Sequence, residues 1–235
     1  MILRWLIYFS AGALPLCAAI VSGRVELRDS RAPATRHHDD YSGVVVALKP
    51  LDGAPLDVAG KHAVMLQKDK LFSPHVLAIP TGSVVDFPNY DPIFHNAFSS
   101  YSGQVFDIGL YPPGTTRSVR FGREGVVRVF CNIHASMSAV IVVVGSPYFA
   151  ITKRDGKFEI SDVPPAEYHL TVFHERASEA TLRELNRTIT VGTDGASLPA
   201  ISISEAGYLS TPHKNKYGRE YAPDSGDQAF YPGKK

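Results

Sequence analysis

The residues best suited to chemistry lie between two runs of β-branched residues, in the segment Val126–Val144, which reads VVRVFCNIHASMSAVIVVV. Cys131, His134 and Met137 follow one another there at intervals of three residues. Residues three apart in a tight turn have α-carbons within about 7 Å, so two successive turns bring these side chains around one point. A thiolate, an imidazole and a thioether suit copper in both of its oxidation states, whereas a tetrahedral zinc site is not expected to use methionine. The spacing therefore predicts a copper site.

A trigonal copper site needs a second imidazole, which should come from a different loop. His95 is the natural candidate, because it lies in FPNYDPIFHNAFS after the expected strand Ser83–Phe87. The alternative to a copper site is that these residues have only structural roles and coincide by chance. Cys131 would then be a buried small hydrophobe, the histidine would be satisfied by hydrogen bonds, and Met137 would be part of the core.

The first 19 residues predict a secretory signal peptide, since Arg4 precedes the apolar run Trp5–Leu16, which small residues follow. Cleavage near Ala19 implies export to the periplasm and leaves Cys131 as the one cysteine of the mature chain. A lone thiol in an oxidising compartment needs an explanation, and a metal thiolate supplies one. The alternative is an uncleaved membrane anchor, because the charge-free run reaches the lower end of the roughly 17–25 residues that span a bilayer.

Short β-branched and aromatic runs, separated by Gly, Pro, Asn and Asp, predict an all-β protein with two packed β-domains. One short helix is expected over Ala177–Leu185, and a loop over Asp29–Tyr41. The expected strands are Gly23–Arg28, Gly43–Leu48, Ala63–Gln67, Val76–Ile79, Ser83–Phe87, Arg117–Phe121, Val126–Phe130, Ala139–Val144, Phe149–Thr152, Phe158–Ile160, Tyr168–Phe173, Arg187–Val191 and Ala200–Ser204.

Composition argues against several functions. The 24 basic and 23 acidic residues are scattered and give a net charge of +1, so no nucleic-acid partner is expected. Two cysteines cannot form a four-cysteine zinc site, and three methionines do not form a copper-shuttling tract. Neither a nucleophile elbow nor a phosphate-binding glycine loop is found in the sequence.

The motif His95-Asn96, followed by C-x-x-H-x-x-M between two strands, resembles the type 1 blue-copper proteins, the cupredoxins. The short ligand loop is similar to that of amicyanin. The stretch LFSPHVLAIPTGSVVDFPNYDPIFHN resembles the early cupredoxin strands, so the resemblance spans about Ala63 to Val144.

The resemblance implies a Greek-key sandwich with one type 1 copper, held by His95, Cys131 and His134 and weakly by Met137 as the axial ligand. Asn96 is expected to tie the two ligand loops together, with its backbone amide pointing at the Cys131 sulfur. The ring edge of His134 is expected at the surface, as the route for the electron.

A second resemblance concerns YFAITKRDGKFEISDVPPAEYHLTVFHE, which is similar to the carboxypeptidase regulatory-like, or transthyretin-like, β-sandwich. Ala166 and Glu167 stand in the turn where that family usually has glycine. The expected organisation is a cupredoxin domain (57–145) inserted into a transthyretin-like sandwich (20–56 and 146–205). A tandem arrangement is the alternative. Residues 206–235 are expected to form an extended tail, either docked by its tyrosines or disordered.

The leader and the cupredoxin resemblance together imply a periplasmic protein that transfers single electrons, in methylamine or a related oxidation. Such a carrier makes and breaks no bond in a substrate, so the chain is not expected to be an enzyme. The expected partners are a c-type cytochrome or a periplasmic dehydrogenase docking near His134. Membrane contact is expected only if the leader is uncleaved. The alternatives are a non-redox copper-binding protein, a structural adaptor and, less favoured, a redox enzyme subunit, which would need a second cofactor.

Overall fold

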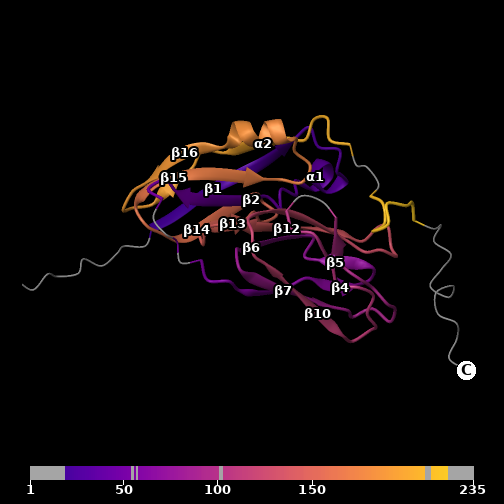
Figure 1. The fold of residues 1–235 in the computed structure, drawn as a ribbon. Helices are drawn as coiled ribbons and strands as arrows, with labels where there is room; N and C mark the ends of the chain where they lie inside the picture. The colour runs from indigo at the N-terminus through magenta and orange to yellow at the C-terminus, as the bar shows by residue number, and fades with distance from the viewer. Residues whose placement is uncertain (1–18, 54–55, 57, 101–102, 210–212, 222–235) are drawn as a thin grey trace, which may run out of the picture.

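The computed structural model describes residues 19–53, 56, 58–100, 103–209 and 213–221. Its regular structure is mostly β-strand, which confirms the predicted all-β fold. The strands form two sandwiches that pack on each other, so that the sheets are stacked in layers (Figure 1).

The first sandwich contains β1 (Ala19–Arg28), β2 (Val45–Pro50), β13 (Phe149–Ile151), β14 (Lys157–Val163), β15 (Ala166–Phe173), β16 (Arg187–Val191), β17 (Ala196–Ser197) and β18 (Ile201–Ser204). One of its sheets has the order β14-β1-β17, with β18 also paired to β1. The other has the order β13-β2-β15-β16. The first sandwich is therefore assembled from strands on both sides of residues 51–148.

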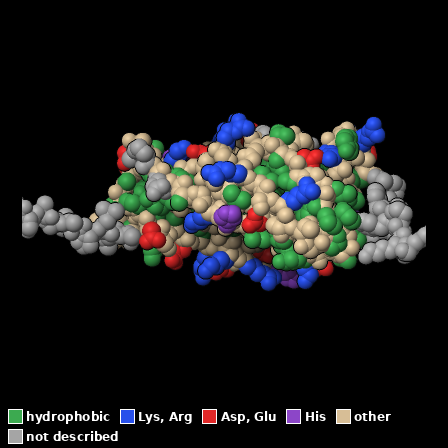
Figure 2. All heavy atoms as spheres, turned by 60° about the horizontal axis from the view of Figure 1, so that its bottom comes forward, with side chains coloured by type: hydrophobic (Ala, Val, Ile, Leu, Met, Phe, Trp, Pro, Cys, Tyr) green, Lys and Arg blue, Asp and Glu red, His purple; other side chains and the backbone are tan. Residues whose placement is uncertain are grey.

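The second sandwich is built from the strands between β2 and β13 in the sequence. They are β3 (His62–Val64), β4 (Leu66–Lys68), β5 (Leu71–Ser73), β6 (Val76–Pro80), β7 (Ser83–Pro88), β8 (Phe98–Ser99), β9 (Phe106–Asp107), β10 (Thr116–Phe121), β11 (Gly125–Phe130) and β12 (Ser138–Val144). One sheet has the order β10-β7-β3 and the other β6-β12-β11-β8-β9, while β4 and β5 form a separate hairpin. Acidic and basic side chains are interspersed on the lower face of the molecule (Figure 2).

Strands β2 and β12 face each other where the two sandwiches meet, and each of these strands is buried on both faces. In β12, Ala139, Ile141 and Val143 belong to the core of the second sandwich, whereas the alternate residues Val140, Val142 and Val144 face β2 of the first. Strand β2 alternates in the same way, because successive side chains point to opposite faces of a sheet. Continuous apolar runs are typical of strands buried on both faces, and they explain the unbroken valine-rich sequences of β2 and β12.

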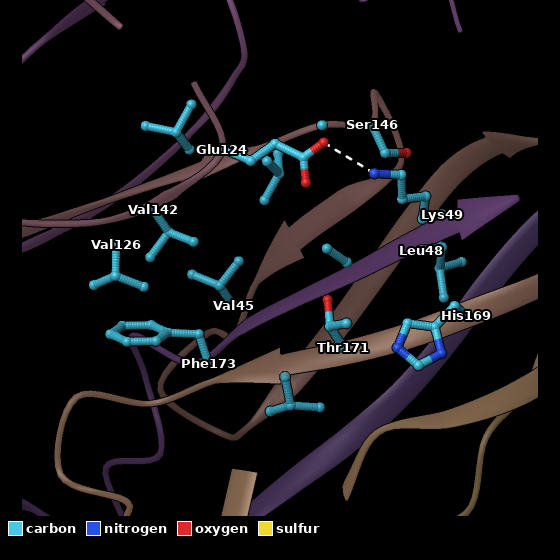
Figure 3. Close-up of a pocket in the computed structure, with 16 residues that line it drawn as sticks. Val45, Leu48, Lys49, Glu124, Val126, Val142, Ser146, His169, Thr171 and Phe173 are labelled. Atoms are coloured by element: carbon cyan, nitrogen blue, oxygen red, sulfur yellow. Dashed lines mark hydrogen bonds and ion pairs between the residues drawn. The ribbon is translucent and has the colours of Figure 1, made fainter. Parts of the chain in front are cut away.

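A small apolar cavity of about 390 Å³ remains in this seam between the sandwiches (Figure 3). Val45, Val142 and Phe173 are among the residues that line it. An ion pair at the edge of the cavity, with Lys49 Nζ 3.0 Å from Glu124 Oε1, joins β2 to the turn before β11. Both side chains are about half exposed, so the pair adds little stability compared with the apolar contacts.

The helices differ in part from expectation. Helix α2 (Glu179–Leu185) lies within the predicted helix. It begins after Ser178, whose hydroxyl accepts a hydrogen bond from the Thr181 amide. The predicted loop over Asp29–Tyr41 is wrong in part, because it contains α1 (Pro33–His38). A proline in the first turn favours such a helix, but six residues are too few to show a periodic pattern.

The expected leader falls almost wholly on residues 1–18, outside the described residues. Its last residue, Ala19, is the first residue of β1, is buried and lies opposite Val163 of β14. Within the described part of the chain, no helix is both long and apolar enough to cross a bilayer.

A buried carboxylate fastens the end of β18. Glu205 accepts hydrogen bonds from Ser30, His174 and Arg176 at 2.7 to 3.0 Å. Burial alone would disfavour the ionised carboxylate, but these partners outweigh it and lower the pKa of Glu205 to about 2.

The pH dependence of stability should report this network. Because the pKa of Glu205 is lower in the folded state than its ordinary value of 4.5, the ionised group stabilises the fold above that pH. This stabilisation is lost as the pH falls toward 2. We expect the free energy of unfolding to fall more steeply over this range in the wild type than in Glu205→Gln, as measured by urea denaturation. The control variant Glu124→Gln removes a carboxylate that is about half exposed, so it should keep the wild-type slope. Equal slopes for wild type and Glu205→Gln would contradict the assignment.

Candidate metal centre

Three potential ligand atoms converge at one end of the second sandwich. Nδ1 of His95 and Nδ1 of His134 each lie 3.9 Å from Sγ of Cys131, and the two nitrogens are 3.2 Å apart. The point equidistant from all three atoms is about 2.1 Å from each, close to the roughly 2.0–2.3 Å of metal–nitrogen and metal–sulfur bonds. The described residues therefore include a donor triangle of a size that fits one metal ion.

The surroundings of the three donors differ. Cys131 and His95 are fully buried, whereas His134 is half-buried. The apolar core of the second sandwich, including Phe87 and Tyr111, extends to the sulfur. A metal at this point would be shielded from water except near His134.

The segment from Cys131 to Met137, called the ligand loop below, is closed by its own backbone. Cys131 is the first residue after β11, and its amide donates to the carbonyl of Met137 at 3.1 Å. The Met137 amide in turn donates to the carbonyl of His134 at 3.1 Å. Met137 is fully buried in the same core cluster as Cys131. The structure therefore places all three motif residues in one tight loop between paired strands.

Asn96 connects the loop of His95 to the ligand loop. Its side-chain Oδ1 accepts the backbone N–H of Asn132 at 2.6 Å. Burial raises the pKa of the Cys131 thiol, while the backbone N–H groups of Asn96, Ile133 and His134 act in the opposite direction. These amides can stabilise a thiolate, which is the form that binds metals.

The sequence analysis missed the partner of His95. The second ring nitrogen of His95, Nε2, lies 2.7 Å from Oδ2 of buried Asp91. Burial disfavours the charge on Asp91, but amides of Lys70 and Asp69 together with the His95 ring more than compensate, so the pKa of Asp91 is lowered. A carboxylate that accepts the remote N–H of a histidine fixes the ring and makes the other nitrogen a better metal ligand.

The backbone also holds His95 in place. Its amide and carbonyl pair with those of Tyr111 at 3.2 and 2.9 Å. Asp91 itself is positioned by Asn89, whose side-chain oxygen accepts the Asp91 amide at 3.1 Å. An acidic residue four positions before the histidine was the available signal, but a loop gives such a spacing no fixed geometry.

Part of the predicted tail also contacts the ligand loop. The hydroxyl of Tyr221 donates to the Cys131 carbonyl at 2.6 Å. The Lys216 amide donates to the Asn132 side chain at 3.0 Å, and the His213 ring lies 2.8 Å from the Ala135 carbonyl. Ala135 and Cys131 are 78 and 90 residues away in sequence from His213 and Tyr221, so no local pattern could have placed these two side chains at the loop.

No family model matches this sequence, and no curated protein is similar to it at a significant level. Solved structures are similar to part of the chain. A purple cupredoxin from Nitrosopumilus maritimus is 26% identical over 35% of this chain and 99% of its own, with a TM-score of 0.32. Amicyanin from Paracoccus versutus is 18% identical over 42% of this chain and 97% of its own, with a TM-score of 0.33. A copper-containing nitrite reductase from Thermus scotoductus is 22% identical over 41% of this chain and 25% of its own, with a TM-score of 0.35.

The Asp91 carboxylate should be needed for tight metal binding. In Asp91→Asn we expect metal affinity to fall by about 10- to 100-fold, because the His95 ring loses its charged hydrogen-bond partner. Affinity can be measured by Co(II) or Cu(II) titration against a competing chelator. Asp86→Asn is the matched control, since Asp86 lies 3.6 Å from the exposed ring of His62. Unchanged affinity in Asp91→Asn would show that Asp91 does not orient a ligand.

Proposed function

We propose that the chain is a copper protein of the cupredoxin type that transfers single electrons. One copper would be held by His95, Cys131 and His134, with Met137 as a weak axial ligand. The observation that carries this proposal is the triangle of two imidazole nitrogens and one cysteine sulfur, with backbone amides directed at the sulfur. Two histidines and one cysteine, with a weak axial methionine, are the donor set of electron-transfer copper sites.

The surrounding residues fit a carrier whose ligands move little. When bound, copper supplies the electron by alternating between Cu(I) and Cu(II). Asn96 and the backbone bonds of the ligand loop hold Cys131 in place, while Asp91 holds His95. His134 is the most accessible of the three donors, which supports it as the point where a redox partner approaches.

The cellular setting belongs to the same proposal. The sequence of the first 19 residues supports export to the periplasm. A c-type cytochrome or a periplasmic dehydrogenase docking near His134 would exchange the electron, in methylamine or a related oxidation. The chain would act as a carrier and not as an enzyme. The first sandwich, for which we propose a transthyretin-like origin, contributes no residue to the donor triangle.

Copper binding gives the direct test. We expect the mature protein to take up one Cu(II) and to gain a strong blue absorption, because a thiolate bound to Cu(II) gives intense charge transfer in the visible range. Cys131→Ser should lose this band. A wild-type protein that stays colourless and binds no copper would contradict the proposal and favour a structural adaptor. Copper binding without the band would favour a non-redox carrier.

The axial position can be tested separately. In Met137→Leu we expect the blue band to persist and the reduction potential to rise, because losing a donor destabilises Cu(II) more than Cu(I). Potentials can be measured by redox titration of the band. Met65→Leu is the control, since Met65 is also fully buried in the same core but lies outside the ligand loop. Identical potentials in Met137→Leu and the wild type would exclude Met137 as a ligand.

A further inference from the structure

The turns of the ligand loop are closed by a small set of hydrogen bonds among the described residues. Within the loop, two backbone hydrogen bonds close the turns, and Asn96 adds a third bond at Asn132. Ala135 and Ser136, at the tip, are exposed. Residues 213–221, called the strap below, pack against this loop from a distant part of the chain.

The strap reaches three different residues of the ligand loop. Tyr221 bonds the carbonyl of Cys131, Lys216 bonds the side chain of Asn132, and His213 lies against the carbonyl of Ala135. The strap therefore contacts the loop both at its first two residues and at its exposed tip.

The strap is itself anchored to the second sandwich. The His213 ring stacks on Phe130, the last residue of β11, with centroids 4.1 Å apart and planes inclined by 28°. The Tyr221 hydroxyl lies 3.1 Å from Nδ1 of His213, so the two rings support each other. The Lys216 ammonium lies 2.7 Å from Asp107 Oδ2, and Asp107 also accepts a long bond from Asn96.

We propose that the strap is part of the metal centre, and that Tyr221 and His213 are positioning residues for the ligand loop. Tyr221 acts on the backbone of the cysteine ligand itself, and His213 on the residue that follows His134. Together they keep the loop closed in the metal-free protein and slow the release of a bound ion. The metal part of this inference rests on the proposed function, whereas the holding of the loop does not.

Hydrogen exchange in the metal-free, full-length protein tests the holding of the loop. The reporters are the amides of Cys131 and Asn132, which donate to Met137 and Asn96. In Tyr221→Phe we expect both amides to exchange on the order of fivefold faster, as for the loss of one net hydrogen bond. In His213→Ala, which also removes the stacking on Phe130, the increase should be at least as large.

Tyr217→Phe is the matched control. Tyr217 belongs to the same strap but is 69% exposed, and its ring contacts Lys216. Its exchange rates should equal those of the wild type. Equal rates in Tyr221→Phe and this control would overturn the inference.

Copper release to a chelator and the position of the blue band test the metal part. Tyr221→Phe should release copper several-fold faster and shift the band, while Tyr217→Phe should do neither. Unchanged release and an unchanged band would overturn the strap's role in the metal centre, even if exchange were faster. If the wild type binds no copper, the proposed function fails, and exchange alone then decides whether the strap holds the loop.

Discussion

The antiparallel pairing of β11 with β12 is the constraint on which the candidate site depends. The register runs from Gly125 opposite Val143 to Phe130 opposite Ser138, so the chain must reverse within the ligand loop. That short reversal leaves Cys131 at the end of the core and turns His134 back toward it. His95 arrives from a separate loop that is tied to Tyr111 by a backbone bridge. The pairing of the strands, more than contacts among the three donor side chains, therefore brings the donor atoms together.

The same strands join the two halves of the molecule. Since β12 is buried on both faces, its inner residues belong to the core that contains Cys131, while its outer residues pack on β2. Removing both faces of a strand from water provides a large apolar stabilisation that fixes its register. The donor triangle at the end of such a strand is therefore held by a strand whose register is fixed on both faces.

Local patterns in the sequence explain what could be predicted. The all-β fold could be predicted because its strands are rich in β-branched residues and are separated by turn residues. The candidate ligand motif could be predicted because Cys131, His134 and Met137 share one loop. The contact of Asp91 with His95 could not be predicted because it depends on the conformation of a loop. The contact of Tyr221 with Cys131 could not be predicted because it joins residues 90 positions apart through tertiary packing. Two-residue strands such as β8 and β17 were missed because they are too short to show alternation. Helix α1 was missed for a similar reason.

The central claim is that the fold holds His95, Cys131 and His134 in a metal-binding triangle before any metal binds. Crystal structures of the metal-free and copper-loaded protein test it most directly. The account predicts that the three atoms keep separations near 3.2, 3.9 and 3.9 Å in the metal-free form, and that copper lies between them in the loaded form. An open ligand loop in the metal-free crystal, or copper bound by other residues, would contradict the account.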